Sequence, residues 1–201
     1  MVRTVLFHCF GLRSGSVYLN DFGGNQELER YVGHIERHSD GFHFPIDAIP
    51  LIKTHDLPRP ADRSPVIYVV RDGRAACLSL YYFCNKRIPL AEIITGQARI
   101  GQWHLAKWSD HILAWNPWNR SNTMLIRYED LSAALPGVIQ RLSQFLNREP
   151  IRDRIPPRDE IVAVDGRWVR SGSHRDESFP AELVDLFRQH HGAMMERLGY
   201  T

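Results

Sequence analysis

Residues 66–83 read VIYVVRDGRAACLSLYYF, and this stretch decides the fold class. Its first five residues, 66–70, form an apolar run without alternation, which is typical of a strand covered on both faces in a parallel sheet. A polar turn follows at residues 71–73, and the pattern over residues 74–83 predicts a helix. A buried strand that leads directly into a helix is the building unit of α/β proteins.

Outward from this stretch, the same two patterns recur along the chain. Short apolar runs predict further strands at 4–10 (TVLFHCF), 49–52 (IPLI) and 124–126 (MLI). Amphipathic patterns predict helices at 26–38, 101–115, 136–146 and 180–198. Strands that alternate with helices predict an α/β fold with one doubly wound sheet of mainly parallel strands flanked by helices, and the length of 201 residues predicts a single domain over 1–201.

Composition narrows the class of protein. Hydrophobic residues make up 43% and charged residues 24% of the chain, values typical of a folded globular domain. With 25 Lys and Arg against 23 Asp and Glu, and with no run of like charges, we expect no nucleic-acid partner. The sequence has no signal peptide pattern and no apolar segment of about 18 residues, so we expect a cytoplasmic protein without a membrane span.

Cysteines and histidines do not form a metal or disulfide pattern in this sequence. The three cysteines are an odd number without a CxxC pair, and the ten histidines include no HExxH motif. We therefore expect neither a disulfide framework nor a metal site.

A glycine- and serine-rich segment follows the first predicted strand. Residues 11–16 read GLRSGS, in which the glycines permit close backbone approach and the serines offer hydroxyl groups. A helix that starts here would point its free N–H groups at an anion, so the segment predicts a phosphate-binding turn. The Walker A pattern GxxxxGK[ST] is absent, and an ordinary turn is the alternative interpretation.

Basic and hydroxyl side chains follow the other predicted strands, where open α/β sheets bind their ligands. Lys53 and His55 come directly after the 49–52 run, and histidine is well suited to exchange protons near neutral pH. Arg71 and Ser79, eight residues apart, could hold one phosphate between them. The alternatives are a solvated loop at Lys53 and His55, and a local pair between Arg71 and Asp72.

Taken together and in this order, these segments resemble the motifs of the sulfotransferases that use 3′-phosphoadenosine 5′-phosphosulfate (PAPS). Residues 13–19 (RSGSVYL) are similar to that family's 5′-phosphosulfate loop, and the KTH at 53–55 matches its KTH segment. The 3′-phosphate motif is matched by VRDGRA at 70–75 with Ser79, in the form of the tyrosylprotein branch. Further matches are YEDL at 128–131 with the YED segment and RSG at 170–172 with the RKG turn, so that the similarity runs from about residue 4 to 175.

The resemblance implies a P-loop-like sulfotransferase architecture and a role for each matched residue. His55 would be the general base, Lys53 its electrostatic companion, and Arg13 the group that stabilises charge on the leaving oxygen. Donor-binding residues would be Arg13, Ser14, Gly15, Ser16, Val17, Tyr18, Arg71, Ser79, Tyr128, Arg170, Ser171 and Gly172. This chain departs from the family pattern at Val17, which replaces a threonine, and at Ser171, which replaces a lysine.

The implied reaction transfers a sulfuryl group from PAPS to a hydroxyl or amine and releases 3′-phosphoadenosine 5′-phosphate (PAP), without a metal ion. The acceptor is left open among small molecules, glycans and peptides. A catalytically degenerate PAP- or PAPS-binding module is the alternative, and the presence of His55, Lys53 and Arg13 favours the enzyme. A P-loop kinase is disfavoured because the GK[ST] pattern is missing.

Overall fold

The computed structural model describes residues 1–16, 32–38, 41–43, 51–59, 63–101, 103–164 and 178–200. The chain divides into two compact units: residues 1–56 with 129–174 form unit 1, and residues 57–128 with 175–201 form unit 2. Parallel strand pairs accompanied by helices occur in both units, so the α/β fold class is confirmed. No described helix is long and apolar enough to cross a membrane.

Unit 1 contains a short parallel sheet with the order β2-β1-β5. Its strands are β1 (Ser14–Ser16), β2 (Val32–His34) and β5 (Leu51–Lys53). The central strand β1 aligns Ser16 with His34 on one side and with Lys53 on the other. An antiparallel pair, β3 (Glu36–His38) and β4 (Gly41–His43), follows β2.

The first element of unit 1 corrects one prediction, because residues 4–10 form a helix and not a strand. Helix α1 (Val2–Phe10) buries Val5, Leu6, Cys9 and Phe10, which lie on one face at helical spacing. Gly11 ends the helix in the left-handed conformation with φ 64°, and the Leu12 N–H donates to the Leu6 carbonyl at 3.0 Å. A short apolar run fits either structure, and the glycine that closes the last turn favours the helix.

The predicted helix at 26–38 is also wrong within the described residues, where 32–34 and 36–38 are strands; residues 26–31 lie outside them. Pairing of residues 32–34 with β1 and of residues 36–38 with β4 accounts for the difference. The Ile35 N–H donates to the Ser16 carbonyl at 3.1 Å, and the Ile35 side chain is buried. Gly33, a weak helix former, aligns with Gly15 in this sheet.

Among the described residues, unit 1 has three further helices: α6 (Asp130–Ala133), α7 (Leu135–Leu146) and α8 (Arg158–Val164). Helix α7 confirms the prediction at 136–146. A proline lies in its first turn, its buried face consists of Val138, Ile139 and Leu142, and Asn147 ends it in the left-handed conformation.

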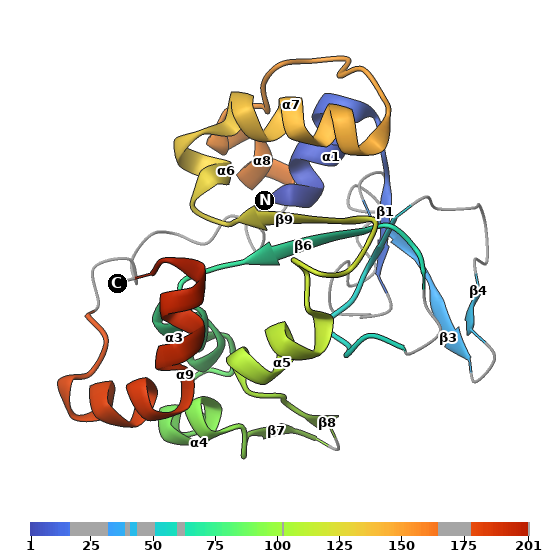
Figure 1. Ribbon diagram of the computed structural model, residues 1–201. Coiled ribbons are helices and arrows are strands. Elements are labelled where there is room, and N and C mark those ends of the chain that lie inside the picture. The colour runs from blue at the N-terminus through green and yellow to red at the C-terminus, as the bar shows by residue number, and fades with distance from the viewer. Residues whose placement is uncertain are drawn as a thin grey trace. The chain divides into compact units, whose positions relative to one another are not determined.

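Unit 2 is built on β6 (Val66–Val70) and β9 (Thr123–Arg127), which lie side by side as a parallel pair (Figure 1). Both strands were predicted, and so were the helices α3 (Gly73–Phe83) and α9 (Val184–Leu198), the latter preceded by a 3₁₀ turn, η3 (Ala181–Leu183). The predicted helix at 101–115 is shorter, because α5 spans Trp108–Trp115. Upstream of it, Gly101 with φ 60° allows a tight turn between β7 (Arg99–Ile100) and β8 (Trp103–His104).

The core of unit 2 forms where α9 packs against α3, α5 and α4 (Leu90–Thr95) (Figure 1). Gly73 allows a close approach between helices: a Cβ atom there would lie 2.9 Å from both Phe187 and Trp108. His191 of α9 is buried in this core, with Nδ1 3.0 Å from Ser109 Oγ and Nε2 2.9 Å from the Ile94 carbonyl oxygen. These contacts join three helices around one histidine.

Candidate functional site

The serines of the predicted phosphate-binding turn lie in the central strand of unit 1. Ser14–Ser16 form β1, and residues 17–31, where a helix after this segment would lie, are outside the described residues. Ser14 is 4% exposed and Ser16 is fully buried, because neighbouring strands flank this small-residue segment on both sides. Ser16 is the carboxyl-terminal residue of β1, at the edge of the sheet where parallel α/β sheets bind ligands.

Two arginines adjoin this strand. Arg13 directly precedes Ser14, and its Nε atom is buried. Arg3 of α1 donates from Nε to Ser14 Oγ at 2.6 Å, a short charge-assisted hydrogen bond. Sequence reasoning missed Arg3, since the contact depends on the turn at Gly11 that folds α1 back toward β1.

Lys53 and His55 lie at the carboxyl end of β5. Lys53 is the last residue of the strand and aligns with Ser16 of β1, so both residues lie at the same edge of the sheet. Thr54 Oγ1 accepts a hydrogen bond from the Asp56 N–H at 2.9 Å, which holds the backbone on both sides of His55. The His55 side chain is exposed.

In unit 2, the structure brings Arg71 and Tyr128 together. Strands β6 and β9 align Val70 with Arg127, so the next residue of each strand lies beside the other, and the Tyr128 N–H donates to the Val70 carbonyl at 2.7 Å. The guanidinium carbon of Arg71 lies 4.8 Å from the centroid of the Tyr128 ring, a cation–π contact. Both side chains are half-buried at the carboxyl ends of the parallel strands.

Asp72 pairs with Arg74 at the start of α3. Its carboxylate accepts from the Arg74 backbone N–H at 2.8 Å and from Arg74 Nη2 at 2.8 Å, and so caps the helix. Burial by itself would raise the pKa of Asp72, but the hydrogen bonds and charge of Arg74, together with a hydrogen bond from the Ala75 N–H, lower the pKa overall. Ser79, the other predicted phosphate ligand of unit 2, lies half-buried on α3.

The family model for the sulfotransferase domain matches residues 47–159, more than half of the chain. The chain belongs to the sulfotransferase domain family. The matched segment includes the elements β5, β6, α3 and β9. It also includes five of the predicted site residues, Lys53, His55, Arg71, Ser79 and Tyr128.

Individual sulfotransferases show the same similarity. Sulfotransferase 2B1 of Mus musculus is 33% identical over 94 residues, which cover 44% of this chain and 28% of that protein. Sulfotransferase 1E1 of Cavia porcellus is 28% identical over 131 residues, which cover 56% of this chain and 41% of that protein. The matched part therefore spans less than half the length of these relatives. A crystal structure of mouse sulfotransferase SULT7A1 complexed with PAP has 16% identity and a TM-score of 0.37, and covers 58% of this chain and 41% of that one.

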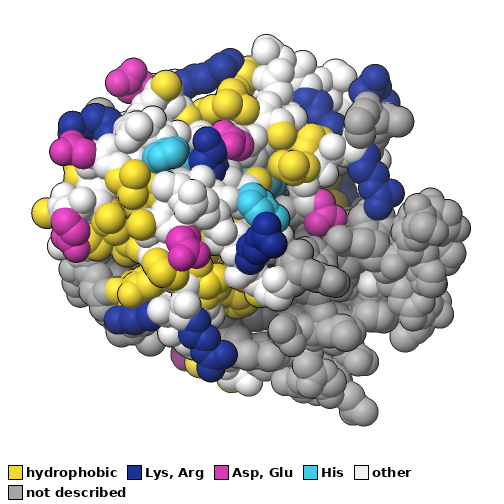
Figure 2. All heavy atoms as spheres, turned by 90° about the horizontal axis from the view of Figure 1, so that it is seen from below, with side chains coloured by type: hydrophobic (Ala, Val, Ile, Leu, Met, Phe, Trp, Pro, Cys, Tyr) yellow, Lys and Arg dark blue, Asp and Glu magenta, His cyan; other side chains and the backbone are white. Residues whose placement is uncertain are grey.

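Five positions predicted from the sulfotransferase motifs lie outside the described residues: Val17, Tyr18, Arg170, Ser171 and Gly172. Within the described ranges, no group of three or more His, Cys, Asp and Glu side chains could hold a metal ion. On the face shown in Figure 2, basic and acidic side chains are interspersed and do not gather by sign.

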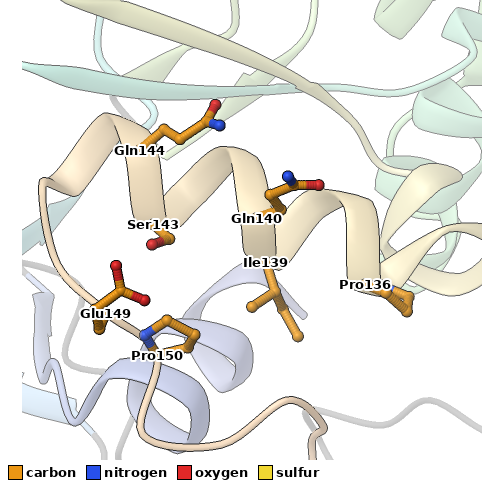
Figure 3. Close-up of a pocket in the computed structure, with 7 residues that line it drawn as sticks. All are labelled: Pro136, Ile139, Gln140, Ser143, Gln144, Glu149 and Pro150. Carbon is orange, nitrogen blue, oxygen red and sulfur yellow. The ribbon is translucent and has the colours of Figure 1, made fainter.

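Two cavities lie outside the predicted motifs of this sulfotransferase chain. The first, of about 360 Å³, lies in unit 1 between the face of α7 that carries Ile139 and Ser143 and the turn at Glu149 and Pro150 (Figure 3). The second, of about 370 Å³, lies in unit 2 and includes Tyr81, Tyr82, Leu90 and Leu183 among its lining residues. None of the predicted donor-binding or catalytic residues lines either cavity.

Proposed function

We propose that this sulfotransferase-family chain transfers a sulfuryl group from PAPS to a hydroxyl or amine of a small-molecule, glycan or peptide acceptor. The observation that supports this most is the placement of the motif residues. Within unit 1, Ser16 and Lys53 share one carboxyl edge of a parallel sheet, and within unit 2, Arg71 lies on the ring of Tyr128 at such an edge. Each pair consists of groups suited to bind one part of a phosphorylated nucleotide.

The sulfotransferase resemblance assigns the matched residues of each unit to a different part of the donor. Arg13, Ser14, Gly15 and Ser16 would bind the 5′-phosphosulfate, with Val17 and Tyr18 continuing the loop. Arg71 and Ser79 would bind the 3′-phosphate together with residues 170–172, and Tyr128 would contact the adenine. The Arg71 guanidinium contacts the Tyr128 ring, and its planar fork suits bidentate binding of a phosphate.

The transfer step needs a base and a means to stabilise the leaving oxygen. The acceptor oxygen or nitrogen would attack sulfur in line, while the bond between sulfur and the bridging phosphate oxygen breaks. The acceptor proton would pass to the imidazole of His55, and the electron pair would remain on the 5′-phosphate of PAP, near the charges of Arg13 and Lys53. As in phosphoryl transfer, positioning and charge neutralisation would carry most of the catalysis.

Calorimetric titration of PAP without Mg²⁺ tests the donor assignment. We expect one PAP per chain. Loss of a charged hydrogen bond to phosphate is typically about 1.5–3 kcal/mol, so Arg71→Ala should weaken binding by roughly 10- to 150-fold. The matched control is Arg99→Ala, which removes an exposed arginine of the same unit and should bind PAP normally.

Turnover separates the enzyme from its alternatives. With radiolabelled PAPS and a panel of phenols, sugars, peptides and alcohols, His55→Ala should bind PAP normally and lose about 10²- to 10⁴-fold in kcat. Full turnover by His55→Ala would refute the base. PAP binding without transfer to any acceptor would favour the binding module, and binding of ATP in place of PAP would favour a kinase.

A further inference from the structure

Arg3 touches the proposed donor site although no sulfotransferase motif includes it. Its Nε atom donates to Ser14 Oγ at 2.6 Å, and its Nη2 atom is buried in unit 1. This contact places a guanidinium group against a buried serine of the segment that is similar to the 5′-phosphosulfate loop.

The charge of Arg3 lies at an unfavourable place in its own helix. It is in the first turn of α1, which contains no acidic residue, and the N-terminus of a helix already carries partial positive charge. Burial lowers the pKa of the Met1 amine, and the nearby positive charges of Arg3 and Lys53 lower it further. Lys53 therefore adds positive charge close to Arg3 and Met1. An anion bound here would relieve this repulsion.

The hydrogen bond also fixes what the Ser14 hydroxyl can do. A hydroxyl has one hydrogen and two lone pairs. Because the Arg3 guanidinium can only donate, it occupies a lone pair of Ser14 Oγ and leaves the Ser14 hydrogen available to another acceptor. A phosphate or sulfate oxygen is such an acceptor.

We propose that Arg3 is a further donor-binding residue, which orients the Ser14 hydroxyl toward the 5′-phosphosulfate of PAPS and adds positive charge at that end of the donor. This inference rests on the proposed function, since it assigns Arg3 to the same donor site. The sulfotransferase motifs do not include Arg3, which lies in α1, a helix that the sequence did not predict.

Two nucleotides that differ only at the 5′ end isolate this role. PAP carries both the 3′- and the 5′-phosphate, whereas adenosine 3′-monophosphate lacks the 5′-phosphate. By calorimetry, Arg3→Gln should weaken PAP binding by about 10- to 100-fold and leave adenosine 3′-monophosphate binding unchanged. A merely structural role would weaken both nucleotides alike, because loss of folded protein scales both affinities together.

Four more variants complete the experiment. Arg148→Gln removes an exposed arginine of the same unit and should leave both affinities unchanged. Arg3→Lys keeps the charge and should retain part of the preference for PAP. If Arg3 acts both through Ser14 and through its own charge, the Arg3→Gln, Ser14→Ala double variant should lose more affinity for PAP than Ser14→Ala, but less than the sum of the two single losses.

The outcomes separate the two proposals. If the unsubstituted protein binds neither nucleotide, the PAPS-dependent function is overturned, and the role of Arg3 with it. If it prefers PAP and Arg3→Gln and Arg3→Lys keep the full preference, the function stands and the role of Arg3 is refuted. Should Arg3→Gln fail to fold, Arg3→Lys and Ser14→Ala still decide, because unchanged preference in both would contradict the inference.

Discussion

Acidification should destabilise unit 2 through His191. The ring is 1% exposed and packs against Trp108 and Phe187. Because the Ile94 carbonyl only accepts, Nε2 carries the proton of the neutral ring, and Nδ1 faces the Ser109 hydroxyl. Burial lowers the pKa of His191 from 6.5 to about 4, against a smaller opposing effect of the hydrogen bond to Ile94.

The sign and size of the effect follow from this shift. The unfolded chain binds a proton to His191 as the pH falls below 6.5, whereas the folded chain does so only near pH 4. The neutral ring therefore contributes stability above pH 6.5 that is lost progressively toward pH 4. The loss is about 2 kcal/mol by pH 5 and about 3 kcal/mol when complete.

Urea unfolding at pH 7.5 and pH 5.0, followed by tryptophan fluorescence, measures this loss. In His191→Gln, the amide can still donate to the Ile94 carbonyl, but it has no charge to gain. The difference in the free energy of unfolding between the two pH values should therefore shrink by about 2 kcal/mol. His104→Gln replaces an exposed histidine of the same unit and should keep the pH dependence of the unsubstituted protein.

Equal pH dependence in His191→Gln and in the unsubstituted protein would refute this reasoning. A second measurement does not require a variant. The ring protons of His191, followed by NMR, should keep the chemical shift of the neutral form from pH 8 down to pH 5. Titration of that ring near pH 6.5 would show that burial does not disfavour its charged form.

Two further predictions concern the N-terminus of α3. Gly73→Ala places a Cβ atom 2.9 Å from Phe187 and Trp108 and should destabilise unit 2 by about 1–3 kcal/mol. The control, Gly137→Ala in α7, adds a Cβ with no atom within 4 Å and should be neutral or stabilising. Thermal unfolding compares the two variants, and equal effects would contradict the close approach at Gly73. Asp72→Ala removes the helix cap and should cost about 1 kcal/mol at pH 7, measured by urea unfolding. Since the folded state lowers the pKa of Asp72, the carboxylate stabilises the folded protein above pH 3.8. The difference in the free energy of unfolding between the unsubstituted protein and Asp72→Ala should therefore narrow as the pH falls below that value. A constant difference would exclude a contribution from the charge.

Elements with a strong local signal were predictable from the sequence. The run at 66–70 continues into a capped helix, and α7 begins with proline and ends at Asn147, so propensity, pattern and caps agree. The run at 4–10 failed because it is short and apolar, and only Gly11, through its left-handed conformation, distinguishes helix from strand. The segment 32–38 failed because residues 32–34 pair with β1 and residues 36–38 pair with β4, and local patterning reveals neither partner.

The candidate site likewise contains residues that were predicted from the sequence and a residue that was not. Arg71 and Tyr128 were each predicted to follow a strand, and the parallel register of β6 and β9 brings them together. Arg3 was not predicted, because its contact with Ser14 depends on the path of the chain through α1 and Gly11. Residue types at strand ends can be read from sequence, whereas contacts made across a turn between two elements require the fold.

The position of α9 in the chain has a consequence for synthesis. Its residue His191 bonds to Ile94 and Ser109, which precede it by 97 and 82 residues, and its apolar face completes the core around α3 and α5. During translation, the strands and helices of residues 66–115 therefore leave the ribosome long before the helix that covers them. Until α9 is made, their apolar surfaces remain uncovered, so we expect nascent chains of this protein to depend on chaperones late in synthesis.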